Sequence, residues 1–137
     1  MKKIEAIIHP FRFDEVKEAL VRNGIEAMTV SEVKGSDGQS GQVRMYRGTS
    51  YVTDLRPRIK IELVIADDQV LTAVGVLQKA APVDKVGPEI ILVMPIENVV
   101  RIRTGEHGEA AIRSASRVVR ETPAQPQAHP SLVPATA

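Results

Sequence analysis

Two arginines near the end of the patterned part of the chain, Arg101 and Arg103, are well suited to bind an anion. They alternate along a segment, residues 99–102 and just beyond, that we predict to be a short final strand, so both guanidinium groups should point to one face. Each guanidinium offers a planar set of donors that fits phosphate oxygens. A solvated strand face, or ion pairs with Glu97 or Glu106, would explain the same pattern. The residues alone leave polyphosphate binding open.

A second candidate is the polar, basic stretch at residues 35–57, which holds four glycines and both tyrosines, Tyr46 and Tyr51. Loops without secondary structure that exceed about 12–15 residues are uncommon in small domains and are usually functional or disordered. Lengthening a loop costs little closure entropy. We therefore expect the protein to work by presenting this loop. An exposed Tyr51 could be a site of covalent modification or an unmodified anchor for a partner, since a phenol suits interfaces.

Gln39 lies between Gly38 and Gly41 in the same loop. Its amide oxygen could ligate Mg²⁺, and flexible glycines let a backbone close over an anion. An ordinary polar loop residue is the alternative. No histidine is placed for a structural metal, because His9, His107 and His129 show no ligand spacing.

Composition narrows the class of protein. The 137 residues suit one domain, and with 43% hydrophobic but only 3% aromatic residues the core must be aliphatic. A formal charge of +1 gives no electrostatic case for binding nucleic acid or an anionic membrane. The chain has no cysteine, which excludes disulfides and thiolate chemistry. No apolar run is long enough for a signal sequence or a membrane span, so we expect a cytoplasmic location.

Hydrophobic periodicity predicts an α+β fold with the order strand–helix–strand, twice. Alternation is clearest at residues 58–65, where Ile59, Ile61, Leu63 and Ile65 face one way. This is the ferredoxin-like pattern of an antiparallel sheet with two helices on one face. The predicted strands are residues 4–8, 25–33, 58–65, 90–94 and 99–102, and the predicted helices are residues 14–23 and 67–77, the second capped by Asp67 and Asp68.

The other face of such a sheet also needs a cover, and the chain offers no further element for it. Self-association is the economical solution, so we predict a homo-oligomer. From residue 113 to 137 the chain contains four of its nine prolines and no sustained periodicity, which predicts a disordered tail after a short helix.

Several segments, in order and without gaps, resemble the PII signal-transduction proteins: MKKIEAIIHPFRFDEVKEAL, MTVSEVKG, YRGTSYV, RIKIELVIADD and VVRIRTGEHGEAAI. The resemblance covers residues 1–112 and implies a ferredoxin-like homotrimer with nucleotide pockets between subunits. It also implies a non-enzymatic regulator that binds ATP or ADP, with AMP a further candidate, and in many members 2-oxoglutarate with Mg²⁺. The loop at about residues 36–56, the family's T-loop, would dock onto an ammonium or other transporter, a metabolic enzyme or a regulator.

The resemblance also assigns roles to residues. The nucleotide-binding residues it implies are Ile7, Thr29, Asp37, Gly38, Gln39, Glu62, Val64, Gly87, Arg101 and Arg103. Those implied for 2-oxoglutarate and Mg²⁺ are Gln39, Arg58 and Gly87, with Arg58 standing where the family usually has lysine. Tyr51 matches the tyrosine that a uridylyltransferase modifies in many members. The residues implied to contact a target are Arg44, Tyr46, Arg47 and Tyr51.

The chain departs from the family in its ligand loops. Where the family usually reads T-G-K-I-G-D-G-K, residues 83–90 read VDKVGPEI, so Lys85 and Gly87 remain while Glu89 and Ile90 replace glycine and lysine. A carboxylate near phosphates is repulsive, and losing a charged donor costs about 1.5–3 kcal/mol. This predicts weakened ATP binding and preference for a nucleotide with fewer phosphates. A related alternative is a divergent paralogue that senses ADP or AMP, with bicarbonate, in inorganic-carbon uptake.

Two alternatives belong to other classes. Small ferredoxin-like domains can support phosphatase chemistry, but the sequence shows no nucleophile paired with a base. A structural or metal-handling trimer with no nucleotide role is the other, and it would form an intact trimer that binds no adenylate.

Overall fold

A four-stranded antiparallel sheet in the order β2-β5-β1-β6 forms the body of the protein. The structure is a computed structural model that describes residues 1–36, 42–53, 55–82 and 89–113. The sheet strands are β1 (Lys2–Ile8), β2 (Thr29–Gly35), β5 (Arg56–Ile65) and β6 (Ile90–Pro95). With β1 and β5 at its centre, this sheet confirms the predicted ferredoxin-like α+β architecture.

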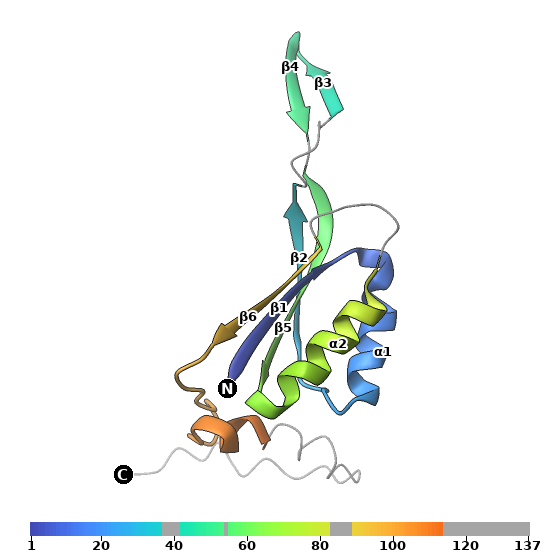
Figure 1. Cartoon of the computed structure of the whole chain (residues 1–137). Coiled ribbons are helices and arrows are strands. Elements are labelled where there is room, and N and C mark those ends of the chain that lie inside the picture. The colour runs from blue at the N-terminus through green and yellow to red at the C-terminus, as the bar shows by residue number, and fades with distance from the viewer. Residues whose placement is uncertain (37–41, 54, 83–88, 114–137) are drawn as a thin grey trace, which may run out of the picture.

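Both helices cover the same face of the sheet (Figure 1). They are α1 (Phe13–Arg22), which follows the short η1 (Pro10–Arg12), and α2 (Val70–Ala80), which follows η2 (Asp67–Gln69). Alternate strand residues point at the helices and are buried, as the period of two requires. The core is aliphatic, as predicted, and its buried residues are Ile4, Ala6, Ile8, Val16, Leu20, Ile25, Ile61, Leu63, Ile65, Ala73 and Leu77.

The C-terminal end of α1 agrees with the prediction, whereas the N-terminal end of α2 does not. Asn23 and Gly24 end α1 as predicted: Asn23 is the C-cap, and Gly24 takes a left-handed φ of 80° that favours glycine. The predicted aspartate cap of the second helix is wrong, because neither η2 nor α2 has a side-chain cap. The Asp67 carboxylate instead binds the amino group of Met1 at 3.0 Å and Lys2 Nζ at 2.9 Å.

The predicted strand at residues 25–33 begins four residues later, at Thr29. After the left-handed turn at Gly24, the Ile25 N–H donates to the Leu20 carbonyl at 2.9 Å, and the Ile25 side chain is buried in the core. Residues 25–28 therefore close the helix end and do not extend the sheet. Their apolar side chains explain why the sequence pattern includes them in the strand.

The long loop contains a hairpin, which corrects the prediction of a stretch without secondary structure. Strands β3 (Gln42–Tyr46) and β4 (Thr49–Thr53) pair in antiparallel fashion and project beyond the sheet (Figure 1). Arg47 and Gly48 connect them with φ of 49° and 78°. Two successive positive φ values are typical of a type I′ turn, whose twist matches that of a hairpin. Arginine is an unusual first residue for this turn, so the sequence signal was weak.

The predicted final strand at residues 99–102 is also wrong. Only an isolated bridge, between Val100 and His107, is present there. The Gly105 N–H donates to the Arg101 carbonyl at 2.8 Å and closes a turn, with Gly105 at a φ of 72°. A helical turn at residues 108–113 follows and lies below the sheet, at the end opposite the hairpin (Figure 1). Arg101 and Arg103 therefore do not alternate on a strand.

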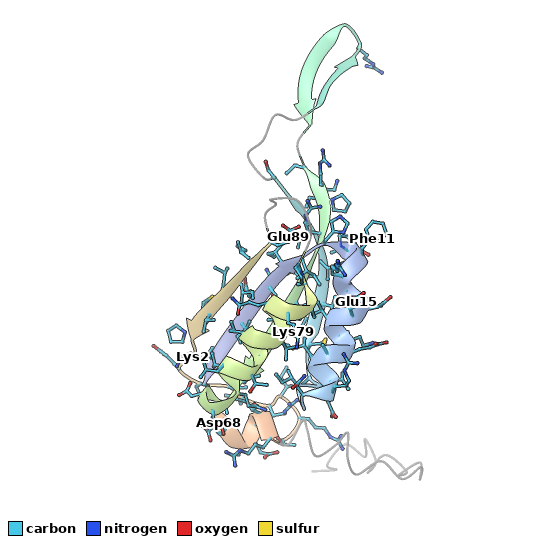
Figure 2. All side chains as sticks on the ribbon, turned by 45° about the vertical axis from the view of Figure 1, so that its right-hand side comes forward. Lys2, Phe11, Glu15, Asp68, Lys79 and Glu89 are labelled. Carbon is cyan, nitrogen blue, oxygen red and sulfur yellow. The ribbon has the colours of Figure 1, made fainter. Side chains whose placement is uncertain are left out.

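The body has two opposite ends. Phe11 and Glu89 lie at the end from which the hairpin projects, whereas Lys2 and Asp68 lie at the other (Figure 2). The strand register is consistent with this, because Ile7 pairs with Lys60 and Ile90 while Lys2 pairs with Ile65 and Pro95. We call these the hairpin end and the C-terminal end.

Candidate functional site

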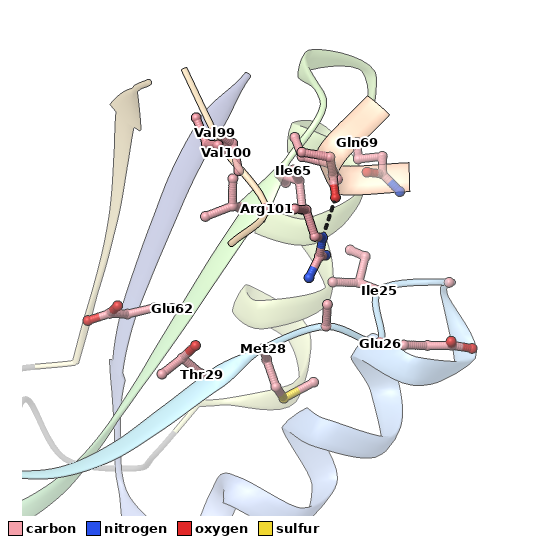
Figure 3. Close-up of a pocket in the computed structure, with 15 residues that line it drawn as sticks. Ile25, Glu26, Met28, Thr29, Glu62, Ile65, Gln69, Val99, Val100 and Arg101 are labelled. Atoms are coloured by element: carbon pink, nitrogen blue, oxygen red, sulfur yellow. Dashed lines mark hydrogen bonds between the residues drawn. The ribbon is translucent and has the colours of Figure 1, made fainter. Parts of the chain in front are cut away.

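A cleft of about 390 Å³ lies toward the C-terminal end of the body. It exists because β2 begins late: Thr29 pairs with Glu62, so β5 continues through Val64 and Ile65 without a strand beside it on that edge. The segment from Gly24 to Met28 forms one wall, and residues from the C-terminal segment form another (Figure 3). Residues 25–28, which were predicted to be strand, therefore form part of the cleft.

The cleft brings together four predicted nucleotide-binding residues from three separate segments: Thr29, Glu62, Val64 and Arg101. Its complete lining is Gly24, Ile25, Glu26, Ala27, Met28, Thr29, Glu62, Val64, Ile65, Gln69, Val99, Val100, Arg101, Ala111 and Ile112. Apolar side chains dominate, with a few polar groups among them, which is the usual composition of a small-molecule site.

Arg101 is held in place by the C-terminal turn. Its Nε donates to the Ala111 carbonyl at 2.7 Å (Figure 3). Its backbone N–H donates to the Glu106 carbonyl at 2.9 Å. Ala111 is fully buried, so this hydrogen bond is made to an acceptor that is shielded from solvent. The terminal amino groups of the guanidinium make no hydrogen bond within the described part of the chain, so they can bind a ligand.

Asn98 closes the base of the same segment. Its Oδ1 accepts from the N–H groups of Val99, at 2.9 Å, and Gly108, at 3.2 Å. Its Nδ2 lies 3.3 Å from Nδ1 of His107. The Gly108 N–H also donates to the Val99 carbonyl at 2.9 Å. Residues 98–108 therefore form a closed loop that presents Arg101 toward the cleft.

Glu62 lines the cleft and also belongs to a network of ion pairs on the sheet face that lacks helices. Lys60 Nζ lies 3.3 Å and Lys3 Nζ 3.5 Å from its carboxylate, and Lys3 also binds Glu5 at 3.0 Å. The hydrogen bond from Lys60, together with the charge of Lys3, holds the pKa of Glu62 below its usual value despite some desolvation. Glu62 is therefore a carboxylate at neutral pH and can accept hydrogen bonds only.

Other predicted site residues lie at the hairpin end. Ile7 points to the helix-free face there, opposite Lys60 on β5. Arg58 is buried, its Nη1 donates to the neighbouring Pro57 carbonyl at 2.8 Å, and its buried Nε has no partner among the described residues. Arg103 is exposed and does not line the cleft. One chain therefore does not bring Arg58 and Ile7 together with Arg101.

Four predicted ligand residues, Asp37, Gly38, Gln39 and Gly87, lie outside the described residues. The predicted target-contacting residues belong to the hairpin: Arg44 pairs in register with Tyr51, and Tyr46 pairs with Thr49. Arg47 occupies the turn at its tip and is exposed.

Sequence reasoning missed the wall formed by residues 24–28 and the contribution of Gln69 and Ala111. Glu26 is the most unusual of these residues, because its Oε2 is buried and has no partner within the described ranges. The Asn23–Gly24 helix stop was the available signal, since a chain that leaves a helix through a left-handed glycine needs several residues before it joins a sheet.

Neither a metal centre nor a membrane span is evident in the part of the chain that the structure describes. No group of three or more His, Cys, Asp or Glu side chains there could hold a metal ion. No helix of the described ranges has the length and hydropathy that crossing a bilayer requires.

Comparison with known proteins identifies the relationship. A family model described as "Nitrogen regulatory protein P-II" matches residues 1–106. The chain belongs to the PII family. It is 52% identical over 112 residues to the nitrogen regulatory protein P-II of Cereibacter sphaeroides, a match that covers 82% of this chain and 100% of the relative. The P-II protein of Azospirillum brasilense is 53% identical, and P-II 1 of Escherichia coli strain K12 is 49% identical, with the same coverage.

Membership has direct consequences. PII proteins are non-enzymatic signalling proteins, so this chain is a signal-transduction regulator and not an enzyme. PII proteins act through target proteins and are typically trimers. The family assignment therefore confirms the predicted class of a non-enzymatic signalling protein.

Proposed function

We propose that this chain forms a homotrimer that binds an adenine nucleotide between neighbouring subunits and uses its projecting hairpin to control a target protein in nitrogen and carbon metabolism. The observation that supports it most is the convergence of Thr29, Glu62, Val64 and Arg101 in one cleft. These residues come from three distant segments, and all four are residues that the resemblance to PII proteins implies for nucleotide binding.

The division of the site between two ends of the body favours an intersubunit position. Arg101 lies at the C-terminal end, whereas Arg58, Ile7 and Glu89 lie at the hairpin end. A nucleotide that contacts both sets must therefore lie where the C-terminal end of one copy meets the hairpin end of another.

The helix-free sheet face supports self-association. Alternating charges at its centre, from Lys3, Glu5, Lys60 and Glu62, neutralise one another within the chain. Beside them, the β6 residues on the same face are apolar, and Ile90 and Leu92 are 49% and 42% exposed. Because these charges are paired within the chain, the face carries no net charge that would repel a second copy, and its apolar margin favours burial.

The unpaired edge of β5 suits the base of the nucleotide. Beyond the Thr29–Glu62 pair, a strand edge offers backbone N–H and C=O groups that have no sheet partner on that side. An adenine edge presents a donor and an acceptor side by side, which matches such a backbone. The Val64 side chain lines the same cleft and supplies an apolar contact.

Arg58 supports an anionic effector at the base of the hairpin. It is the buried charged residue of the described core, 8% exposed, and it has no carboxylate partner there. An unpaired buried charge is costly, so a ligand carboxylate would stabilise it. This fits 2-oxoglutarate, held with Mg²⁺ through Gln39, and bicarbonate is the smaller alternative.

The hairpin supplies the means of controlling a target. It projects from the body, presents Arg47 at its tip and places Tyr51 on β4. A position on a projecting hairpin is accessible to a uridylyltransferase as well as to a target, such as an ammonium or other transporter, a metabolic enzyme or a regulator. Effector binding at the hairpin base would then shift the hairpin between target-competent and target-incompetent states, provided that affinity differs between them.

The sequence of residues 83–90 favours a second version of this function. Glu89, at the hairpin end, places a carboxylate where the family usually has glycine, and Ile90 removes a lysine. Both changes disfavour a triphosphate. A regulator that prefers ADP or AMP, and senses bicarbonate in inorganic-carbon uptake, would need fewer phosphate contacts.

Calorimetric titration with ATP, ADP and AMP, each with and without Mg²⁺ and 2-oxoglutarate, tests the proposal. Tight ATP binding that 2-oxoglutarate strengthens would support a nitrogen sensor. Binding of ADP or AMP alone, indifferent to 2-oxoglutarate, would support the second version. Binding of none of them by an intact trimer would refute nucleotide sensing and favour a purely structural role.

A further inference from the structure

The loop that presents Arg101 contains an imidazole in a hydrogen bond that protonation would break. We propose that His107, acting through Asn98 and Gly108, positions the C-terminal turn whose Ala111 carbonyl orients the Arg101 guanidinium, so that protonation of His107 loosens the arginine of the cleft. The proposal rests on the proposed nucleotide site, and its test separates the two.

The orientation of the Asn98 amide fixes the proton of His107. Because Asn98 Oδ1 faces two backbone donors, Val99 N–H and Gly108 N–H, the other amide atom must be the nitrogen. That nitrogen is a donor and lies 3.3 Å from His107 Nδ1. His107 Nδ1 must therefore be the acceptor, and the neutral ring has its proton on Nε2. In the imidazolium form both ring nitrogens are donors, and the bond is lost.

The hydrogen bond between Asn98 and His107 is connected to Arg101 through Gly108 and Ala111. The Gly108 N–H donates to both Asn98 Oδ1 and the Val99 carbonyl, and Gly108 is the first residue of the helical turn. Three residues later, the Ala111 carbonyl accepts from Arg101 Nε at 2.7 Å. Weakening the hold on Gly108 moves the acceptor that orients the guanidinium. Val99 keeps its bond to Gly108, so the effect is a loosening and not an unfolding of the turn.

His107 is exposed, so it exchanges protons freely with solvent. Besides His107, the ionisable side chains of residues 97–113 are Glu97, Arg101, Arg103, Glu106, Glu109 and Arg113, and Arg113 Nη2 pairs with Glu109 at 3.2 Å. Histidine side chains in general change charge between about pH 5 and 8, which sets the pH range of the measurements below.

The first measurement is hydrogen exchange of the Arg101 Nε–H, followed by NMR on the whole chain from about pH 8 to pH 5.5. The His107→Gln variant is compared at each pH, since a glutamine amide oxygen can accept from Asn98 without titrating. We expect the wild-type Nε–H to lose protection about two- to tenfold relative to the variant as pH falls, which corresponds to one neutral hydrogen bond. Equal protection in both proteins at every pH would overturn the proposal.

The second measurement is calorimetric ADP affinity over the same range. Comparing variants at each pH cancels the titration of ADP itself. We expect wild-type affinity to fall about two- to tenfold more than that of His107→Gln. The matched control is His9→Gln, because His9 Nδ1 also accepts a hydrogen bond, from Phe11 N–H at 3.2 Å, but does not line the cleft. Its pH profile should overlay the wild type.

The two measurements distinguish the possible failures. If wild-type protein binds no ADP at any pH, the proposed nucleotide site is wrong, and the exchange of the Arg101 Nε–H still decides whether His107 positions it. If ADP binds but the His107→Gln profile overlays the wild type, the positioning role is wrong and the nucleotide site stands.

Discussion

Substituting lysine for Arg101 and, separately, for Arg103 tests whether the structure or the sequence pattern identifies the ligand-binding arginine. The pattern treats Arg101 and Arg103 alike, whereas the structure places Arg101 in the cleft and leaves Arg103 exposed outside its lining. We expect Arg101→Lys to weaken ADP binding strongly and Arg103→Lys to weaken it little, although both substitutions keep the charge.

The magnitude follows from counting donors. A guanidinium has five N–H groups, and Arg101 uses its Nε–H on Ala111, so four remain for a ligand while its orientation stays fixed. A lysine has its donors on one atom and cannot bind the Ala111 carbonyl and a phosphate in the same geometry. Losing one charge-assisted hydrogen bond costs about 1.5–3 kcal/mol, which is about 10- to 150-fold in affinity. For Arg103 the loss should be about fivefold at most, as for exposed charge pairs.

The assay is calorimetric titration with ADP in the absence of Mg²⁺, with thermal melts to show that each variant is folded. Arg101→Lys should also destabilise the protein by about 0.5–1.5 kcal/mol, because it removes one bond to the C-terminal turn. Equal losses of affinity for the two variants would refute the assignment of the cleft, since both arginines would then contact ligand in the same way. A loss below about threefold for Arg101→Lys would refute the orienting role of Ala111.

Three further substitutions test the scaffold. Leu20→Ala should lower the free energy of unfolding by about 2–5 kcal/mol in urea, because Leu20 is fully buried in the core. Gly24→Ala should cost about 1 kcal/mol or more in the same assay, since its φ of 80° disfavours a Cβ although nothing lies near it; an unchanged midpoint would contradict the left-handed turn. Asp67→Asn should lower Tm at pH 7, because hydrogen bonds from Lys2 and from the amino group of Met1 hold the pKa of Asp67 below its usual value. A depressed pKa stabilises the protein above the unfolded-state pKa and ceases to do so as pH falls through the folded one, so the Tm difference should vanish in acid.

The sequence predicts the secondary structure correctly where local propensity and burial favour the same conformation. Along β5 the period of two is unbroken from Ile59 to Ile65, and those side chains do face the helices. The Asn23–Gly24 stop likewise ends α1 where expected. In these places local propensity and burial require the same conformation, so a pattern is sufficient.

The predictions failed where tertiary contacts decide between conformations that the pattern allows equally. Ile25 and Met28 are apolar and would suit a strand, but Ile25 is needed to fill the core beneath α1. The Arg47–Gly48 turn needs two positive φ values, which glycine accepts and arginine tolerates only because the flanking strands pair. At Gly105 a backbone bond to Arg101 replaces the expected strand with a turn.

Two of these failures, the late start of β2 and the absent last strand, border the cleft for a physical reason. In this sheet the cleft lies at an unsatisfied edge, which exists because β2 begins at Thr29 while β5 continues past Glu62. Residues 25–28, predicted to be strand, do not pair with β5. The predicted last strand turns back at Gly105. Neither segment therefore covers the edge of β5 at Val64, which lines the cleft. If either segment had continued as a regular strand, that strand would have occupied the space of the cleft. The residues that bind can thus be recognised by resemblance, but the space they surround depends on the interruption of the regular pattern.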